Sequence, residues 1–324
     1  MPELPEVETT TQGLKKTIVG LTIKNVWTDL ATKDKRKVDS VANTKYFKSF
    51  KRQILNRKIV SIERRAKNIL INLENKKTIL IHLKMTGHLL YGKYKFNPSP
   101  TLPLSRGGRR VGSWLPAKKG PLHDPYNRFV HVVFTLLNPR QSGASNTHLA
   151  FSDARKFGKV VLLDTKTAHE SKHLNNIGPE PLEPEFKIGN LKQRLNRWGN
   201  KKIKTALMDQ SIIAGIGNIY SDEILWRAGV HPERKVSKVK TEGKNSEMKL
   251  IFRAIKEVLA KGIDFGGDSM SDYRNVEGLP GKFQLHHEAY RRTKEKCRKP
   301  GCKGVILRKV VTGRSAHFCS IHQR

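Results

Sequence analysis

The N-terminus combines a proline and two acidic residues in a spacing that suits covalent amine chemistry. If Met1 is removed, which the small second residue permits, Pro2 presents a secondary amine. An α-amino group titrates near about 7.7–8.0 and a lysine near about 10.4, so the chain terminus is the better nucleophile at neutral pH. Glu3 is the next residue and Glu6 follows one helical turn later, so a carboxyl for proton transfer accompanies the amine. The alternative is an ordinary acidic helix start.

The C-terminal cysteines and one histidine have the spacing of a zinc site. Two close pairs, with four and two residues between their members, are separated by sixteen residues, and they are Cys297, Cys302, Cys319 and His322. Zinc takes four thiolate or imidazole ligands in a tetrahedron, and paired ligands joined by a hairpin, here about Val305–Val311 and Ser315–Phe318, supply that shape. The alternatives are reduced structural cysteines, or completion of the site by His317, His286 or His287.

The segment 203–232 has the start and stop residues that are typical of two helices joined by a glycine turn. Asn218 takes the N-cap position of the second helix, and Gly229 ends that helix. Gly215 and Gly217 have no Cβ to obstruct a close approach, and the free N–H groups of the helix start favour an anion such as phosphate. An ordinary helical hairpin is the alternative.

The charge of the chain indicates the class of its partner. Its 324 residues contain 63 Lys and Arg against 28 Asp and Glu, a formal net charge of +35. Such an excess is typical of nucleic-acid binders, because each neutralised phosphate releases a condensed counterion. The sequence has no apolar run of membrane-spanning length and no signal segment, so we expect a cytoplasmic, nucleoid-associated protein.

Hydrophobic periodicity divides the chain into a strand-rich first part and a helical second part. Helical patterns occupy 2–19, 187–197, 201–209, 219–228 and 245–262. Short β-branched strands are predicted at 21–26, 59–62, 69–73, 78–83, 130–136, 148–151 and 160–163. Several short strands imply a sandwich or a barrel.

Breaks in these patterns give the domain boundaries. We predict an N-terminal domain at 1–165, a proline-rich linker at 166–190, a helical domain at 191–285 and a zinc finger at 286–324. The first domain carries an atypical insertion at about 93–127. Within it, residues 98–121 are rich in Gly, Pro and basic residues and predict a long surface loop, either a disordered insertion or a DNA-contacting arm.

Five motifs in order resemble the formamidopyrimidine-DNA glycosylase family. They are MPELPEVE, IHLKMTG, FSDARKFG, the helix pair and the GRSAHFC-containing hairpin. The resemblance implies an α+β multidomain chain with an N-terminal β-sandwich and leading helix, a C-terminal helix-two-turn-helix domain and a β-hairpin zinc finger holding one structural Zn²⁺. It also implies a monomeric bifunctional base-excision repair enzyme. Such an enzyme removes oxidised purines, 8-oxoguanine and formamidopyrimidines, from double-stranded DNA and cuts the abasic strand.

The resemblance assigns roles to residues at matching positions. Pro2 would be the nucleophile that attacks sugar C1′, Glu3 the acid and base, and Glu6 a ligand of the damaged base. Lys67 and Arg314 would assist β- and δ-elimination, although either is otherwise one of 63 cations.

Further matching positions concern DNA. Met85 and Phe157 would fill the gap left by the flipped nucleotide, and Arg155 would pair with the orphaned cytosine, although core packing is the alternative for the two apolar residues. The predicted DNA-binding residues are His131, Arg155, Lys204, Asn218 and Arg314. Glu180 matches a linker glutamate, and residues 266–284 resemble a lid that closes over the lesion.

The chain departs from the family pattern at its metal site and insertion. The family usually spaces its first two cysteines by two residues and ends in cysteine, whereas this chain has four residues there and His322. Two rival functions remain: an endonuclease VIII-like glycosylase for oxidised pyrimidines, or a noncatalytic zinc-dependent DNA-binding protein that keeps Met1.

A steep salt dependence of DNA binding follows from the charge. We expect the affinity for duplex DNA to fall sharply between about 50 and 200 mM salt, because phosphate contacts release counterions. Fluorescence anisotropy across this range measures the slope, and a flat dependence would contradict the prediction.

Overall fold

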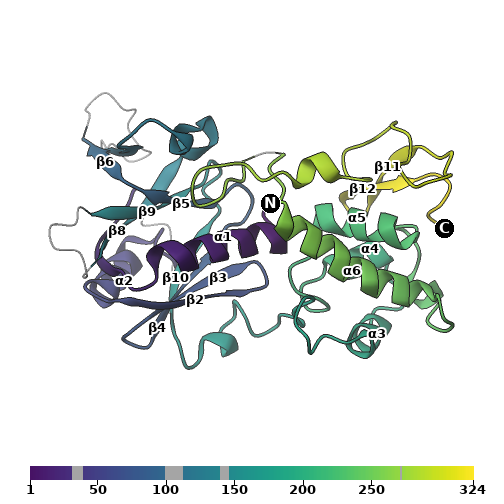
Figure 1. The fold of residues 1–324 in the computed structure, drawn as a ribbon. Helices are drawn as coiled ribbons and strands as arrows, with labels where there is room; N and C mark the ends of the chain where they lie inside the picture. Colours follow the sequence, from purple (N-terminus) through teal and green to yellow (C-terminus); the bar gives the residue numbers. More distant parts are fainter. Residues whose placement is uncertain (31–38, 99–111, 139–145, 271) are drawn as a thin grey trace. The chain divides into compact units, whose positions relative to one another are not determined.

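The computed structural model describes residues 1–30, 39–98, 112–138, 146–270 and 272–324 (Figure 1). These residues form two compact units. The first contains Met1–Pro2, Glu6–Ser171 and Asp268–Gly281, and the second contains Glu3–Pro5, Lys172–Gly267 and Lys282–Arg324. The main boundary therefore lies inside the expected linker 166–190. The expected lid, 266–284, is divided between the units, and most of it belongs to the first unit.

The first unit is built on two four-stranded antiparallel sheets that share one apolar core. One sheet has the order β1 (Thr22–Thr28), β8 (Val130–Leu137), β9 (Thr147–Ser152) and β5 (His88–Gly92). The other has the order β10 (Lys159–Asp164), β4 (Lys77–His82), β3 (Asn68–Leu73) and β2 (Ile59–Arg65). Apolar side chains from both sheets, such as Phe134 and Ile71, are buried in that core, so the predicted sandwich is confirmed.

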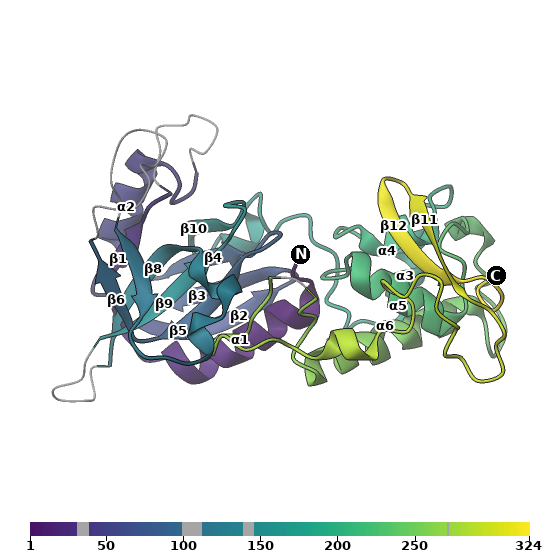
Figure 2. The ribbon, with the colours of Figure 1, turned by 90° about the horizontal axis from the view of Figure 1, so that it is seen from above.

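Two helices complete this unit. Helix α1 (Leu4–Ile18), which runs along the sandwich in Figure 2, begins two residues later than predicted. Its Val7, Leu14 and Ile18 are buried in the sandwich core. Helix α2 (Thr44–Ile54) was not predicted. Only Phe50 and Ile54 of this helix are buried, and four basic residues in the same segment obscure its apolar periodicity.

The insertion contains structure where the sequence predicted only a loop. Strands β6 (Tyr94–Asn97) and β7 (Ser113–Pro116) pair antiparallel, so the loop expected at 98–121 is wrong over 113–116. The reason is aromatic packing: the Phe96 ring lies 5.4 Å from that of Trp114 and 6.1 Å from that of Trp27 on β1. Residues 99–111 lie outside the described residues.

The second unit is mainly helical, as predicted. Its helices are α3 (Ile188–Asn196), α4 (Ile203–Met208), α5 (Asn218–Ala228) and α6 (Glu247–Asp264). Helices α5 and α6 lie side by side around a buried core (Figure 1). The chain ends in the predicted hairpin, β11 (Ile306–Val311) and β12 (Arg314–Cys319). Within the described ranges, no helix is long and apolar enough to span a membrane.

A buried histidine joins β5 to the end of the insertion. His88 is 1% exposed, and its Nε2 lies 2.9 Å from Oδ1 of Asn127. Since both Nδ2 hydrogens of Asn127 point to carbonyl groups, of Pro121 and Gly278, its oxygen faces the ring and places the imidazole proton on Nε2. Burial lowers the pKa of His88 to about 4, so the neutral ring is the folded form at neutral pH.

The depressed pKa of His88 makes the first unit sensitive to acid. Between about pH 6.5 and the folded pKa of about 4, the unfolded chain binds a proton that the folded chain does not, so stability falls as pH falls. We expect His88 to account for a loss of about 2 kcal/mol between pH 7 and 5. Urea unfolding at both pH values measures it. In His88→Gln the loss should shrink by that amount, and an unchanged loss would contradict the assignment.

Candidate active site and metal centre

The carboxylate of Glu3 caps the N-terminus of α5. Its Oε2 accepts hydrogen bonds from the backbone N–H groups of Gly217 (2.6 Å) and Tyr220 (3.3 Å), and its Oε1 accepts one from Ile219 (2.9 Å). The sequence indicated an anion at this helix start, and in the structure the protein's own carboxylate binds there. The Glu3 side chain is therefore fixed by backbone donors and a helix dipole.

The two glycines before α5 exist for the close approach of the N-terminal residues. Gly215 has φ +85°, and a Cβ there would lie 2.5 Å from Cβ of Leu4. A Cβ on Gly217 would lie 2.4 Å from Cδ of Glu3. The helix cap itself is Gly217, and Asn218 is the first helical residue, so the helix begins one residue earlier than predicted. Pro2, just before Glu3, is buried.

Glu6 is the second acidic residue of the N-terminus, and it binds the segment predicted to be a lid. Its Oε1 accepts a hydrogen bond of 2.7 Å from the backbone N–H of Asp268, and its carbonyl oxygen accepts one of 3.0 Å from the hydroxyl of Tyr273. Glu6 is 1% exposed. The structure thus joins Glu6 to residues of the expected lid.

Met85, Arg155 and Phe157 form an exposed cluster at one end of the sandwich. The guanidinium carbon of Arg155 lies 4.8 Å from the ring centre of Phe157, and its Nη1 lies 3.0 Å from Sδ of Met85. Met85 is 38% exposed and Phe157 is 53% exposed. The core-packing alternative is therefore wrong for both residues, and the cluster offers apolar surface together with a hydrogen-bond donor.

Asp153 positions this cluster and was missed from the sequence. Its carboxylate accepts hydrogen bonds from the hydroxyl of Thr86 and from the backbone N–H groups of Arg155 (3.3 Å) and Gly158 (2.7 Å). It is 1% exposed and ties the β4–β5 turn to the β9–β10 loop. The sequence could have indicated Asp153, because it is an acidic residue that stands between a predicted strand and the basic residues of FSDARKFG.

Arg314 lines a strongly basic cavity of the second unit. It follows the hairpin turn at Thr312 (φ +49°) and Gly313 (φ +75°), whose left-handed conformations match a type I′ turn. The cavity has a volume of about 680 Å³, and its walls are Asn218, Tyr290, Arg291, Thr293, Arg308, Gly313, Arg314, Ser315 and His317. These described residues bring three guanidinium groups and no carboxylate, so the cavity suits an anion.

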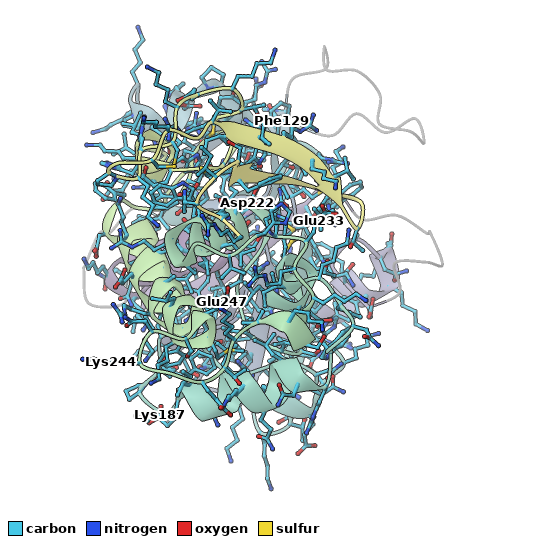
Figure 3. All side chains as sticks on the ribbon, turned by 90° about the vertical axis from the view of Figure 1, so that its right-hand side faces the viewer. Phe129, Lys187, Asp222, Glu233, Lys244 and Glu247 are labelled. Atoms are coloured by element: carbon cyan, nitrogen blue, oxygen red, sulfur yellow. The ribbon has the colours of Figure 1, made fainter. Side chains whose placement is uncertain are left out.

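Lys204 and His131, both predicted to bind DNA, are buried. Lys204 is 1% exposed, and its Nζ lies 2.5 Å from Oδ1 of Asp222, which is labelled in Figure 3. The other oxygen of Asp222 accepts hydrogen bonds from the ring and the backbone N–H of His317. The ion pair joins α4 to α5, and the contact between Asp222 and His317 fastens β12 to α5. His131 is 8% exposed and pairs through Nδ1 with Asp29 (2.9 Å). Neither side chain is presented to a ligand in this conformation.

Lys67 stands in the short turn between β2 and β3. It follows Ala66, which has φ +52°, and its side chain is 6% exposed. The turn thus holds Lys67 at a fixed point at one end of its hairpin.

The three cysteines and His322 form one cluster. One ligand atom from each of Cys297, Cys302, Cys319 and His322 lies within 4.8 Å of all the others, so the cluster could hold one metal ion. Nδ1 of His322 lies 3.4 Å from Sγ of Cys297, and its Nε2 donates to the carbonyl oxygen of Trp226 at 3.0 Å. That bond leaves Nδ1 with its lone pair toward the thiols, as in an outer-shell contact of a metal-binding histidine.

The donor set fits zinc and favours His322 over the other histidines. Burial lowers the pKa of His322, so the ring is neutral and able to ligate at neutral pH. His317 is bound to Asp222, and the ring of His286 stacks on Phe265 at 3.7 Å. The ring of His287 packs against Phe283 at 5.4 Å.

Loss of the fourth ligand should weaken metal binding. We expect about one zinc per purified chain, and in His322→Ala a fall in affinity at least as large as the about 10–100-fold cost of losing an outer-shell partner. Competition with a chromogenic chelator measures it. His286→Ala is the matched control and should retain zinc; equal retention by both variants would show that His322 is not a ligand.

Comparison with known families covers both halves of the chain. The profile of the formamidopyrimidine-DNA glycosylase N-terminal domain matches residues 1–160, and that of the formamidopyrimidine-DNA glycosylase H2TH domain matches residues 177–274. The formamidopyrimidine-DNA glycosylase of Herpetosiphon aurantiacus is 36% identical over 328 residues, covering 100% of both chains. That of Bacillus subtilis is 34% identical, covering 99% of this chain and 98% of the relative.

Solved structures with the same fold include DNA complexes. The complex between the Lactococcus lactis Fpg and DNA containing an abasic site aligns with a TM-score of 0.75 at 28% identity, covering 99% of both chains. The MutM (Fpg) protein of Thermus thermophilus aligns with a TM-score of 0.72 at 30% identity, covering 99% of this chain and 98% of the other.

Proposed function

Since this chain belongs to the formamidopyrimidine-DNA glycosylase family and is a DNA-repair glycosylase, we propose that it is a bifunctional enzyme for oxidised purines. It excises 8-oxoguanine and formamidopyrimidines from duplex DNA and then nicks the strand by β,δ-elimination. The observation that carries this proposal is the anchored carboxylate of Glu3, directly after Pro2. An amine nucleophile and a fixed carboxyl are the two groups that this chemistry needs.

The N-terminal amine supplies the covalent step. With Met1 removed, the nitrogen of Pro2 forms a bond to C1′ of the damaged nucleotide, and the bond from C1′ to the base breaks. The base leaves with that electron pair and a proton, and Glu3 exchanges protons with the departing base or the ribose oxygen. Opening of the sugar ring gives an iminium, which acidifies the C2′ hydrogen, so that loss of a proton expels the 3′ phosphate.

The exposed cluster at the end of the sandwich supports action on a flipped nucleotide. Extruding a nucleotide costs a few kcal/mol of stacking unless something fills the gap. Met85 and Phe157 present apolar surface for that gap, and Arg155 presents donors for the orphaned cytosine. The guanidinium favours oxidised purines as substrates, because cytosine is the base opposite a damaged guanine.

Basic residues serve the strand that is cut. The cavity that Arg314 shares with Arg291 and Arg308 suits a backbone phosphate, which positions DNA without reading its sequence. Arg314 assists δ-elimination from there, and Lys67 assists β-elimination. Zinc at the cysteine and histidine cluster has a structural role, because four protein ligands leave no open position.

Borohydride trapping tests this function directly. Borohydride reduces an iminium to a stable amine, so a duplex carrying 8-oxoguanine opposite cytosine should give a covalent adduct that peptide mass spectrometry maps to Pro2. An adduct with thymine glycol but not 8-oxoguanine would indicate the endonuclease VIII-like specificity. No adduct with any lesion or abasic site would indicate a noncatalytic DNA-binding protein.

A matched variant separates base removal from strand cleavage. Glu3→Gln keeps one oxygen that can accept from the N–H groups of α5, replaces the second acceptor with an NH2 group and cannot exchange a proton. Excision of 8-oxoguanine should fall by about 10²–10⁴-fold, whereas trapping on a preformed abasic site should persist, because no base has to leave. Equal loss on both substrates would show that Glu3 acts only on the fold.

A further inference from the structure

The segment 272–278, termed the strap, is bound to the first unit along its length. The hydroxyl of Tyr273 donates to the carbonyl oxygen of Glu6 (3.0 Å), and the carbonyl oxygen of Val276 accepts from the backbone N–H of Tyr91 (2.7 Å). Val276 is 5% exposed in the sandwich core and lies against Gly13, where a Cβ would come within 2.5 Å of it. The strap is therefore part of this unit's packing.

A buried arginine binds the strap to the end of the insertion. Arg274 and its two partners, Asp124 and Tyr126, are termed the clamp. Arg274 is 6% exposed, its Nε lies 3.0 Å from Oδ2 of Asp124, and its guanidinium carbon lies 4.5 Å from the ring centre of Tyr126. The other oxygen of Asp124 accepts from the backbone N–H of Tyr126 (2.9 Å). A guanidinium held by a carboxylate and an aromatic ring is confined in both position and orientation.

The carbonyl oxygen of Tyr273 connects Arg274 of the clamp to the residues beside Glu6. Nη1 of Arg274 donates to the carbonyl oxygen of Tyr273 at 2.8 Å, and the hydroxyl of Ser269 donates to the same oxygen at 2.8 Å. Ser269 belongs to the leading turn, residues 268–270, whose first N–H binds Oε1 of Glu6. The conformation of the leading turn thus depends on Arg274.

The clamp also connects to the start of β5. Asn127, three residues after Asp124, donates to the carbonyl oxygen of Gly278 (3.3 Å) and accepts from His88 (2.9 Å). His88 is the first residue of β5 and follows Met85 by three residues. One buried polar chain therefore runs from the strap to the start of β5.

We propose that Arg274, held by Asp124 and Tyr126, is a positioning residue that fixes the leading turn beside Glu6 and so determines recognition of the damaged base. This inference rests on the proposed function. The contact acts only when a base is present, because an abasic site offers the leading turn nothing to recognise. A turn fixed before binding loses less conformational entropy when it closes on the base.

The test removes the clamp without leaving a buried charge. In the double variant Asp124→Asn/Arg274→Met the apolar side chain fills the space, no ion is left unpaired, and the amide oxygen introduced at position 124 can still accept from the backbone N–H of Tyr126. We expect the single-turnover rate of 8-oxoguanine excision to fall about 10–100-fold, since small misplacements of a substrate-positioning group cost this much. Nicking of a preformed abasic site should stay within about twofold of the wild type. Tyr46→Phe, which removes a half-buried hydrogen bond from the backbone N–H of Leu162 elsewhere in the unit, is the matched control and should leave both rates unchanged.

Amide hydrogen exchange separates failure of this inference from failure of the proposed function. The amides of Asp268 and Met270 should exchange faster in the double variant than in the wild type and in Tyr46→Phe, whether or not the protein excises 8-oxoguanine. Unchanged exchange, or equal loss on the base-containing and abasic substrates, would overturn the positioning role. A wild type that excises no oxidised purine but shows the exchange difference would refute the proposed function and leave the clamp intact.

Discussion

The capping of α5 by Glu3 is the interaction on which the candidate active site depends. A buried carboxylate is costly unless it is hydrogen-bonded, and here backbone N–H groups of the helix start provide three bonds. Those bonds require that the N-terminal residues approach Gly215 and Gly217 more closely than a Cβ atom at either position would permit. Since the amine candidate, Pro2, is the preceding residue, the same cap restrains where Pro2 lies.

Acidic residues organise a protein whose surface is dominated by cations. With only 28 acidic residues against 63 basic ones, many buried acids perform positioning tasks. Asp153 holds the loops of the exposed cluster, Asp222 joins α4 and β12 to α5 through Lys204 and His317, and Asp124 holds Arg274. The remaining excess of Lys and Arg is then available for a polyanion. A lysine and a histidine predicted from sequence to bind DNA also take part in internal pairs, Lys204 with Asp222 and His131 with Asp29.

Aromatic and polar contacts explain the parts of the fold that the sequence concealed. Strand β7 pairs with β6 because Trp114 packs on Phe96 and Trp27, although its surroundings are rich in Gly, Pro and Lys. Helix α2 forms because Phe50 meets Phe134 of β8 at 6.4 Å. In both elements the stabilising partner is distant in the chain, so local patterns could not reveal it.

The sequence by itself determined the strand-rich and helical halves, the hairpin and the four candidate metal ligands, because alternation, helical period and ligand spacing are local properties. It also supplied the acidic and apolar residues that the candidate site uses. Only the tertiary structure decided that the anion at α5 is Glu3, that Met85 and Phe157 are exposed, and that Lys204 is buried. These outcomes depend on which distant groups satisfy each charge and hydrogen bond, and that competition is settled only when the whole chain packs.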